Sequence, residues 1–406
     1  MATPHDISIP VDLLKSSQEF DALLSAQSVS IRVSDDYERL LTQFNAAPEV
    51  IAIQRLITLA RLGIPLSVIW EERIAGRVFS APALFPLLAV LLTIDCSAHS
   101  IAEPDGTVRN VDVQSSRKAI YNFRPITDLF SDSQVMLCAD SRGYGHPKTL
   151  YDQDGSLGSR SDFDAFVERL LAAQIGINTS TVQAVKFSQN VSTIVAELFE
   201  NTDIHAKQDL RGVPFKTNGL RGMIFKRIEL PPVKRTKFSS PSDSTQSNPF
   251  GEQQRQPRVA LEISVFDSGI GYYGSYMREK LTAEIPLIEE WHVVHRCLER
   301  HYDPTDRSQS SIPPDIRTSH TGMGLYEVLR ALQFLKGKFE VRSGRIYGFR
   351  TFFEGETQFQ IESTASTTRP GMPKPVLLDR GLQYVSVPTL NEMLAGSTIR
   401  VLIPLN

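Results

Sequence analysis

Residues 259–271 have the sequence VALEISVFDSGIG. Apolar residues alternate along its first part, which predicts a strand with one buried face. Asp267 shares the parity of those apolar residues, so its carboxylate is expected to point inward where the strand ends. A buried carboxylate needs a hydrogen-bond donor. Gly269 and Gly271 follow, and they leave room either for a ligand ring or for tight backbone turns.

Upstream, residues 187–206 have the sequence FSQNVSTIVAELFENTDIHA, in which apolar side chains recur at helical spacing. Glu197, Asn201 and His205 are spaced four apart, so they share a second stripe of the same predicted helix. A carboxylate, a carboxamide and an imidazole in one row offer oxygen ligands for a hard cation together with a base. The alternative is a solvated polar face.

Two further segments lie downstream. In 320–336, HTGMGLYEVLRALQFLK, two glycines precede a predicted amphipathic helix, and a helix N-terminus of this kind binds anions. The chain contains no GxxxxGK[ST] motif, which excludes a P-loop. In 396–404, GSTIRVLIP, alternating apolar residues predict a half-buried strand, which would let a hydroxyl residue after Gly396 face the same pocket.

In this order, the four segments resemble the GHKL superfamily of ATPases, which includes gyrase B, the Hsp90 chaperones, histidine kinases and MutL. The ELFEN stretch with His205 resembles the N-box of the histidine-kinase branch, and DSGIG resembles the G1 box. HTGMGL resembles the G2 box, although His320 stands where that box usually begins with another glycine. GSTIRVLIP resembles the closing strand. The resemblance covers about 180–406 without 231–257.

The resemblance implies a Bergerat fold, a two-layer α/β sandwich with a mixed sheet, and the ligands ATP and Mg²⁺. By this resemblance Asn201 coordinates Mg²⁺, while Glu197 contacts the metal through water and orients or deprotonates the attacking water. Asp267 accepts a hydrogen bond from the adenine amino group, and Gly269 and Gly271 admit the adenine. The other implied nucleotide contacts are His205, Thr321, Gly322, Met323, Gly324, Leu325, Ser397 and Thr398.

The remaining sequence predicts two domains. Residues 1–155 alternate strand and helix patterns, with strands expected over 28–33 and 64–70, and a helix over 48–62 that is apolar nearly all round. For 81–95 the pattern fits a buried helix or strand equally. The order of these elements resembles the STAS-like regulatory domains, so this half is expected to be a small α/β domain.

A joint rich in Gly, Ser and Asp ends this half, so 156–406 is expected to form the second, ATP-binding domain. The polar stretch 231–257 has almost no apolar residues and predicts a mobile insert. The segment between the two glycine boxes, 272–321, is expected to form an ATP lid. A helix is predicted within the lid over 287–300.

Composition limits the protein class. The 406 residues are 41% hydrophobic and 22% charged, which is typical of a globular protein and excludes wholesale disorder. A net charge of −3 gives no general attraction to nucleic acid or anionic membrane. Three widely separated cysteines predict neither a disulfide scaffold nor a thiolate zinc site. The most apolar stretch, 83–94, is shorter than the roughly 20 residues of a membrane-spanning helix. The start of the sequence has no signal-peptide pattern, and we expect a cytoplasmic protein.

The leading functional hypothesis is an ATPase whose nucleotide state reshapes the lid and thereby regulates a protein partner, bound through 1–155 or through the lid. The ATPase hypothesis is also compatible with a protein that forms a homo-oligomer. The alternative is a protein kinase, similar to histidine kinases or anti-sigma-factor serine kinases, that moves the γ-phosphate to a partner. A third hypothesis is an ATP-binding scaffold without catalysis, which the presence of both Glu197 and Asn201 disfavours.

Overall fold

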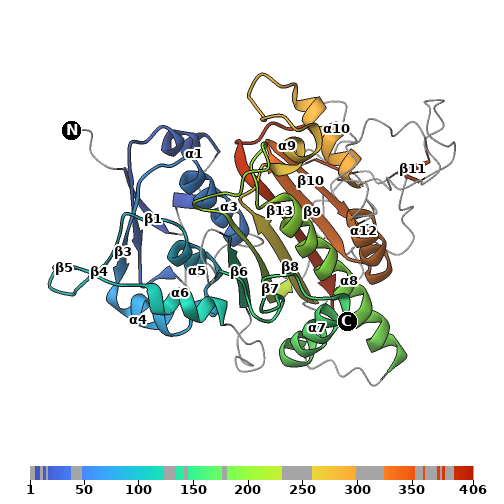
Figure 1. The fold of residues 1–406 in the computed structure, drawn as a ribbon, viewed down its shortest axis with the longest axis horizontal. Helices are drawn as coiled ribbons and strands as arrows, with labels where there is room; N and C mark the ends of the chain where they lie inside the picture. Colours follow the sequence, from blue (N-terminus) through green and yellow to red (C-terminus); the bar gives the residue numbers. More distant parts are fainter. Residues whose placement is uncertain are drawn as a thin grey trace, which may run out of the picture.

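The computed structural model describes residues 5–9, 12–14, 17–37, 48–122, 133–140, 145–175, 181–230, 258–298, 324–352, 360–361, 373–374, 377–379 and 388–405. The described strands form two large sheets and a two-stranded ribbon of β11 (Gln360–Ile361) and β12 (Pro373–Lys374) (Figure 1). The expected insert, 231–257, and the lid beyond residue 298 lie outside the described residues.

The first sheet has five strands in the order β1-β2-β3-β4-β5. Strands β1 to β4 are mutually parallel, and β5 is antiparallel to β4, so this sheet is mixed. Helices connect the parallel strands, as parallel pairing requires. The strands predicted over 28–33 and 64–70 are confirmed as β2 and β3. The strands are β1 (His5–Ile9), β2 (Val29–Val33), β3 (Leu66–Glu71), β4 (Ala98–Ala102) and β5 (Val108–Asn110).

The second sheet has six strands in the order β10-β9-β13-β8-β7-β6. The expectation of a mixed sheet here is wrong, because every strand pair that the structure describes in this sheet is antiparallel. Strands β8 and β9 run in the same direction, but β13 lies between them and runs opposite to both, so no two neighbouring strands are parallel. β9 and β10 are joined at Gly344, whose φ of 56° suits a tight reversal. The strands are β6 (Ser133–Ala139), β7 (Leu220–Leu230), β8 (Arg258–Asp267), β9 (Lys338–Gly344), β10 (Ile346–Thr351) and β13 (Leu394–Pro404).

Helices were expected in both halves of the chain, and the structure contains them. The helix predicted over 48–62 is confirmed, and 81–95, which the sequence left undecided, contains a helix. The described α-helices are α1 (Ser17–Leu24), α3 (Pro48–Arg61), α4 (Glu72–Ser80), α5 (Pro86–Thr93), α6 (Gln114–Tyr121), α7 (Arg160–Ile175), α8 (Val182–His205), α9 (Gly271–Met277), α10 (Leu287–Leu298) and α12 (Gly324–Leu335). Two 3₁₀ turns are η1 (Asp12–Leu14) and η2 (Pro82–Leu84). Among these helices, none has the length and apolarity needed to cross a membrane.

The six-stranded sheet has helices on both faces. Arg221 and Lys226 lie an odd number of positions apart on β7, so their side chains point to opposite faces. Arg221 forms an ion pair with Asp203 of α8, at 3.0 Å, whereas Lys226 lies 3.4 Å from Glu49 of α3. One face is therefore covered by α8, with α12 and α7 packed beside it, and the other face by α3 (Figure 1).

The position of α3 explains its sequence. Every residue from Ala52 to Ala60 is buried, including the polar Gln54, Arg55 and Thr58. Figure 1 shows the helix between the two sheets, so it has no solvent face and shows no amphipathic pattern. The all-round apolar surface predicted over 48–62 thus marks the contact between the two halves of the chain.

A buried carboxylate connects the two halves. Glu392, which precedes β13, lies 2.6 Å from the guanidinium of Arg55 on α3 and also forms an ion pair with Arg342 of β9. Arg55 in turn donates a hydrogen bond to the Leu13 carbonyl at 2.8 Å. Because removal of one partner would leave a charge buried without compensation, this group of residues fixes α3 against β9 and β13.

Candidate functional site

A row of polar side chains crosses the six-stranded sheet on the face that α8 covers. Arg221 of β7 lies opposite Asp267 of β8, Asp267 lies opposite Ser397 of β13, and Ser397 lies opposite Ser343 of β9. Directly opposed residues in antiparallel strands point to the same face. The ion pair of Arg221 with Asp203 shows that this face is turned toward α8.

Asp267 points inward at the end of β8, as its parity predicts, and it is only 5% exposed. Its carboxylate accepts hydrogen bonds from Ser397 Oγ, from the Gly269 N–H at 2.8 Å and from the Ser397 N–H at 3.3 Å. Burial raises the pKa of Asp267 above the ordinary carboxyl value, and these donors oppose that rise in part. The result is a strong hydrogen-bond acceptor held in a fixed orientation.

The two glycines after Asp267 pack against protein atoms. A Cβ placed on Gly269 would lie 2.8 Å from the Ala206 Cα. Gly271 has a φ of 70°, and a Cβ there would lie 2.8 Å from Ser343 Oγ. Of the two roles that the sequence left open, the structure therefore shows the tight backbone turn, and admission of an adenine ring stays a prediction.

The other end of the site lies between α8 and α12. Glu197 and Asn201 are one turn apart on α8, and α12 begins at Gly324. A Cβ on Gly324 would lie 2.8 Å from Glu197 Oε2 and 3.4 Å from Asn201 Nδ2. The expected stripe is confirmed in its first two members, which face the N-terminus of α12. A helix N-terminus presents free N–H groups and a partial positive charge.

Asn201 carries a second signal. Its Nδ2 is buried and has no hydrogen-bond partner among the residues that the structure describes. A buried, unpaired amide donor costs free energy, and a native protein usually keeps one for a ligand or a water. An acceptor such as a phosphate oxygen would satisfy it.

The remaining predicted site residues differ in where they lie relative to the site. His205 is exposed at the end of α8, and Leu325 is buried in the first turn of α12. Thr398 follows Ser397 on β13, so it points to the opposite face, away from Asp267; its expected contact with adenine is not supported by this geometry. Thr321, Gly322 and Met323 lie outside the described residues.

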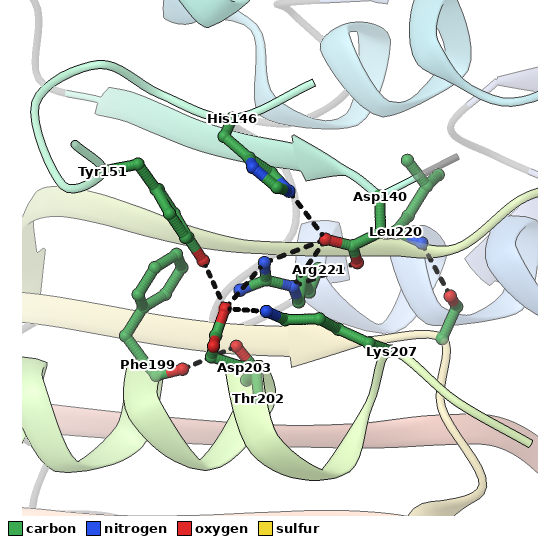
Figure 2. A network of polar contacts seen from close by, with 10 residues as sticks. Asp140, His146, Tyr151, Phe199, Thr202, Asp203, Lys207, Leu220 and Arg221 are labelled. Atoms are coloured by element: carbon green, nitrogen blue, oxygen red, sulfur yellow. Dashed lines mark hydrogen bonds and ion pairs between the residues drawn. The ribbon is translucent and has the colours of Figure 1, made fainter. Parts of the chain in front are cut away.

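A buried ionic network, which was not predicted from the sequence, lies at the end of α8. Figure 2 shows Arg221, which is 0% exposed, between Asp140 and Asp203. Its Nε lies 3.0 Å from Asp140 Oδ2, and its second terminal nitrogen lies 2.8 Å from Asp140 Oδ1 and 3.0 Å from Asp203 Oδ1. Burial favours the neutral guanidine, but the surrounding anionic groups outweigh it and raise the pKa of Arg221 well above its ordinary value.

Three outer residues complete this network. Tyr151 donates a hydrogen bond to Asp203 Oδ1 at 2.7 Å, Lys207 Nζ lies 2.7 Å from the same oxygen, and His146 Nε2 lies 3.0 Å from Asp140 Oδ1 (Figure 2). The network joins β6, β7 and α8 beside the row that contains Asp267. One sequence signal was present: Arg221 shares the parity of the apolar Met223 and Phe225, and a cation at such a position needs carboxylates.

Two other kinds of site, a cysteine nucleophile and a clustered metal site, find no support among the described residues. Burial raises the pKa of Cys138, which lies opposite Arg221, to about 12, so this thiol stays protonated at neutral pH and is not a nucleophile. In the part of the chain that the structure describes, no three His, Cys, Asp or Glu residues are grouped as a metal site.

No protein-family model matches the chain, and neither a curated protein nor a solved structure matches it.

Proposed function

We propose that this protein binds Mg-ATP and hydrolyses it in the manner of the GHKL ATPases. The observation that carries the proposal is the approach of Gly324, at the start of α12, to Glu197 and Asn201 on α8. Asp267 is held inward at the end of β8, on the face of the sheet that α8 covers. An adenine acceptor and a phosphate-binding helix N-terminus would thus lie at two ends of one site.

At the base end, the Asp267 carboxylate would accept a hydrogen bond from the exocyclic amino group of adenine. Two features support this role. The side chain is only 5% exposed, which strengthens its hydrogen bonds, and its orientation is fixed by Ser397 and Gly269. An ionised acceptor in a buried site gives a charge-assisted hydrogen bond, which is about twice as strong as a neutral one.

At the phosphate end, the donor set fits Mg²⁺. Asn201 would supply a hard oxygen ligand beside a helix N-terminus and Glu197 would contact the metal through water, and Mg²⁺ in proteins usually combines few side-chain oxygens with substrate phosphates and waters. The unpaired Asn201 Nδ2 offers a donor to a phosphate oxygen. Bound Mg²⁺ would neutralise phosphate charge as it develops in the transition state. Glu197 would accept the proton of the attacking water.

The rest of the chain suits a nucleotide-driven switch. Binding of ATP at the α12 N-terminus would order the lid, of which α9 and α10 are the described part, and the lid would regulate a protein partner. Residues 1–155, with their resemblance to STAS-like regulatory domains, offer a second surface for that partner. The buried contact of α3 with β13 connects this half to the site.

The test measures Mg-ATP binding by calorimetry and phosphate release in the same preparations. Asn201→Ala should weaken Mg-dependent binding, with Asn190→Ala as the control, because Asn190 donates a hydrogen bond to the Lys186 carbonyl of its own helix. Glu197→Ala should leave ATP bound and slow its cleavage by about 10²- to 10⁴-fold. Glu168→Ala, an exposed glutamate on α7, controls for loss of charge.

The kinase alternative predicts a different outcome in these assays. A protein that binds Mg-ATP, releases no phosphate and labels a partner protein would be a kinase of the histidine or serine type. A protein that shows no affinity for Mg-ATP would contradict both hypotheses.

A further inference from the structure

The two carboxylate oxygens of Glu197 face different groups. Oε1 lies 3.8 Å from a terminal guanidinium nitrogen of Arg160, whereas Oε2 is the oxygen that lies 2.8 Å from the Cβ position of Gly324. One oxygen is thus turned toward α7 and the other toward the α12 N-terminus. A general base must present a lone pair to its proton in a defined direction, so the residue that holds the first oxygen also directs the second.

Arg160 is itself held in place. It is the first residue of α7, and Asp162 in the first turn of this helix accepts hydrogen bonds from the Ser159 N–H, at 2.7 Å, and from Ser159 Oγ, at 2.6 Å. The second terminal nitrogen of Arg160 donates to Thr193 Oγ1 at 2.6 Å. Thr193 lies one turn before Glu197 on α8, so the guanidinium contacts two successive turns of that helix.

The location of this arginine is unfavourable for the helix that carries it. A cation in the first turn opposes the helix dipole, which prefers negative side chains there. Asp164 compensates in part, at 3.6 Å from Arg160 Nε, and it also accepts a hydrogen bond from Ser192 Oγ of α8. The contacts of the guanidinium with Asp164, Thr193 and Glu197 offset this cost, and the one with Glu197 reaches the site.

We propose that Arg160 is a positioning residue for Glu197: it holds Oε1 so that Oε2 faces the phosphate end of the site. This inference rests on the proposed ATPase function. Arg160 acts through Glu197 and contributes nothing to the binding of adenine, which lies with Asp267 at the other end. Its loss therefore affects the chemical step and leaves nucleotide affinity unchanged.

The experiment measures kcat and KM for Mg-ATP hydrolysis, together with direct binding of Mg-ATP, in the full chain. Arg160→Ala should lower kcat by about 10- to 100-fold with KM and binding affinity unchanged. Arg160→Lys keeps the charge and should restore part of the rate. Arg169→Ala is the matched control, because Arg169 is exposed on the same helix and bonds to the Ala165 carbonyl of that helix.

A double-mutant cycle separates positioning from a general structural effect. In a Glu197→Gln background, Arg160→Ala should cause no further loss of rate, because the group that it directs is already inactive. Equal losses in both backgrounds would show that Arg160 only ties α7 to α8, and would overturn the inference. So would an Arg160→Ala protein that keeps the parental kcat.

The proposed function fails in a recognisably different way. A parent protein that binds Mg-ATP and releases no phosphate removes the water-activating role of Glu197, and the role of Arg160 with it. A parent protein that hydrolyses ATP, combined with an unaffected Arg160→Ala variant, overturns the role of Arg160 alone.

Discussion

Ser397 of β13 lies directly opposite Asp267 of β8, and its Oγ donates a hydrogen bond to the Asp267 carboxylate. The two residues are separated in the sequence by the lid segment, by α12 and by the four strands β9 to β12. Their contact is therefore made only when the six-stranded sheet is complete. It makes the orientation and the ionisation of Asp267 depend on β13, and several measurable consequences depend on this carboxylate.

Replacement of Asp267 by Asn should weaken ATP binding. The amide presents either a weaker acceptor or a donor to the adenine amino group, and loss of one charge-assisted hydrogen bond costs about 1.5–3 kcal/mol, or roughly 10- to 100-fold in affinity. Inosine triphosphate lacks this amino group, so the parent should prefer ATP to it and Asp267→Asn should not. Titration of both nucleotides into both proteins measures the difference. Equal ATP affinity in parent and folded variant would remove Asp267 from the site.

Affinity for ATP should fall on acidification, because a protonated Asp267 loses its charge as an acceptor. Burial raises the pKa of this group, so the fall should begin at a higher pH than for an exposed aspartate. The Ser397 hydroxyl lowers that pKa, and Ser397→Ala should therefore move the fall to still higher pH. Calorimetric titrations from neutral to mildly acidic pH measure both curves. Superimposable curves for the two proteins would contradict the coupling.

Replacement of Gly324 by Ala should impair catalysis without unfolding the protein. The new methyl group would lie 2.8 Å from Glu197 Oε2, which is too close, and the flexible carboxylate would move away. Displacement of a catalytic group by about 1 Å costs on the order of 10²-fold in rate. Gly76→Ala on α4 is the control, since a Cβ there meets nothing within 4 Å. Both melting temperatures should stay near the parental value, and phosphate release should fall only for Gly324→Ala.

Acid should destabilise the sheet through Glu340 of β9. Burial alone would raise the pKa of Glu340, but Arg400 and Lys338 outweigh it and lower the pKa from its ordinary 4.5 to about 2. A carboxyl pKa that is depressed in the folded state stabilises the fold above the unfolded-state value and loses that effect as pH falls. Glu340 should thus contribute about 3 kcal/mol to the free energy of unfolding at neutral pH, and this contribution should be lost between about pH 4.5 and about pH 2.

Urea unfolding of the parent and of Glu340→Gln across this pH range checks the prediction. The parent should be the more stable protein at neutral pH, and the difference should shrink as the pH decreases. Glu168→Gln, at an exposed position of α7, should show no such difference. A gap between parent and Glu340→Gln that is independent of pH would show that Glu340 acts through packing alone.

The elements that carry the site were predictable from sequence because each has a strong local pattern. The alternation before Asp267 and the helical spacing of Glu197 and Asn201 are local, and both are confirmed by β8 and α8. The predicted closing strand and the helix after Gly324 are likewise confirmed. The resemblance to GHKL proteins supplied roles for these residues, and those roles stay predictions.

The tertiary partners were not predictable, because they depend on strand register and on which face a helix covers. The sequence around Arg221 does not predict that Asp140 and Asp203 are its counter-ions, and the sequence around Arg160 does not predict its ion pair with Glu197. The expectation of a mixed sheet followed the family resemblance, whereas the sheet is antiparallel because β13 lies between β8 and β9, which run in the same direction, and is opposite to both. The sequence boundary near residue 155 also does not separate the two sheets, because β6 lies before it and pairs with β7 in the second sheet.

The place of β13 inside the second sheet, between β9 and β8, has a consequence for how the protein is made. During translation, β6, β7 and β8 leave the ribosome long before the strand that must insert next to β8. Until then β8 presents an unpaired edge, and α3 lacks the β13 surface that it covers in the finished protein. This sheet therefore cannot be completed until β13 has been synthesised, which makes its completion a late event in translation.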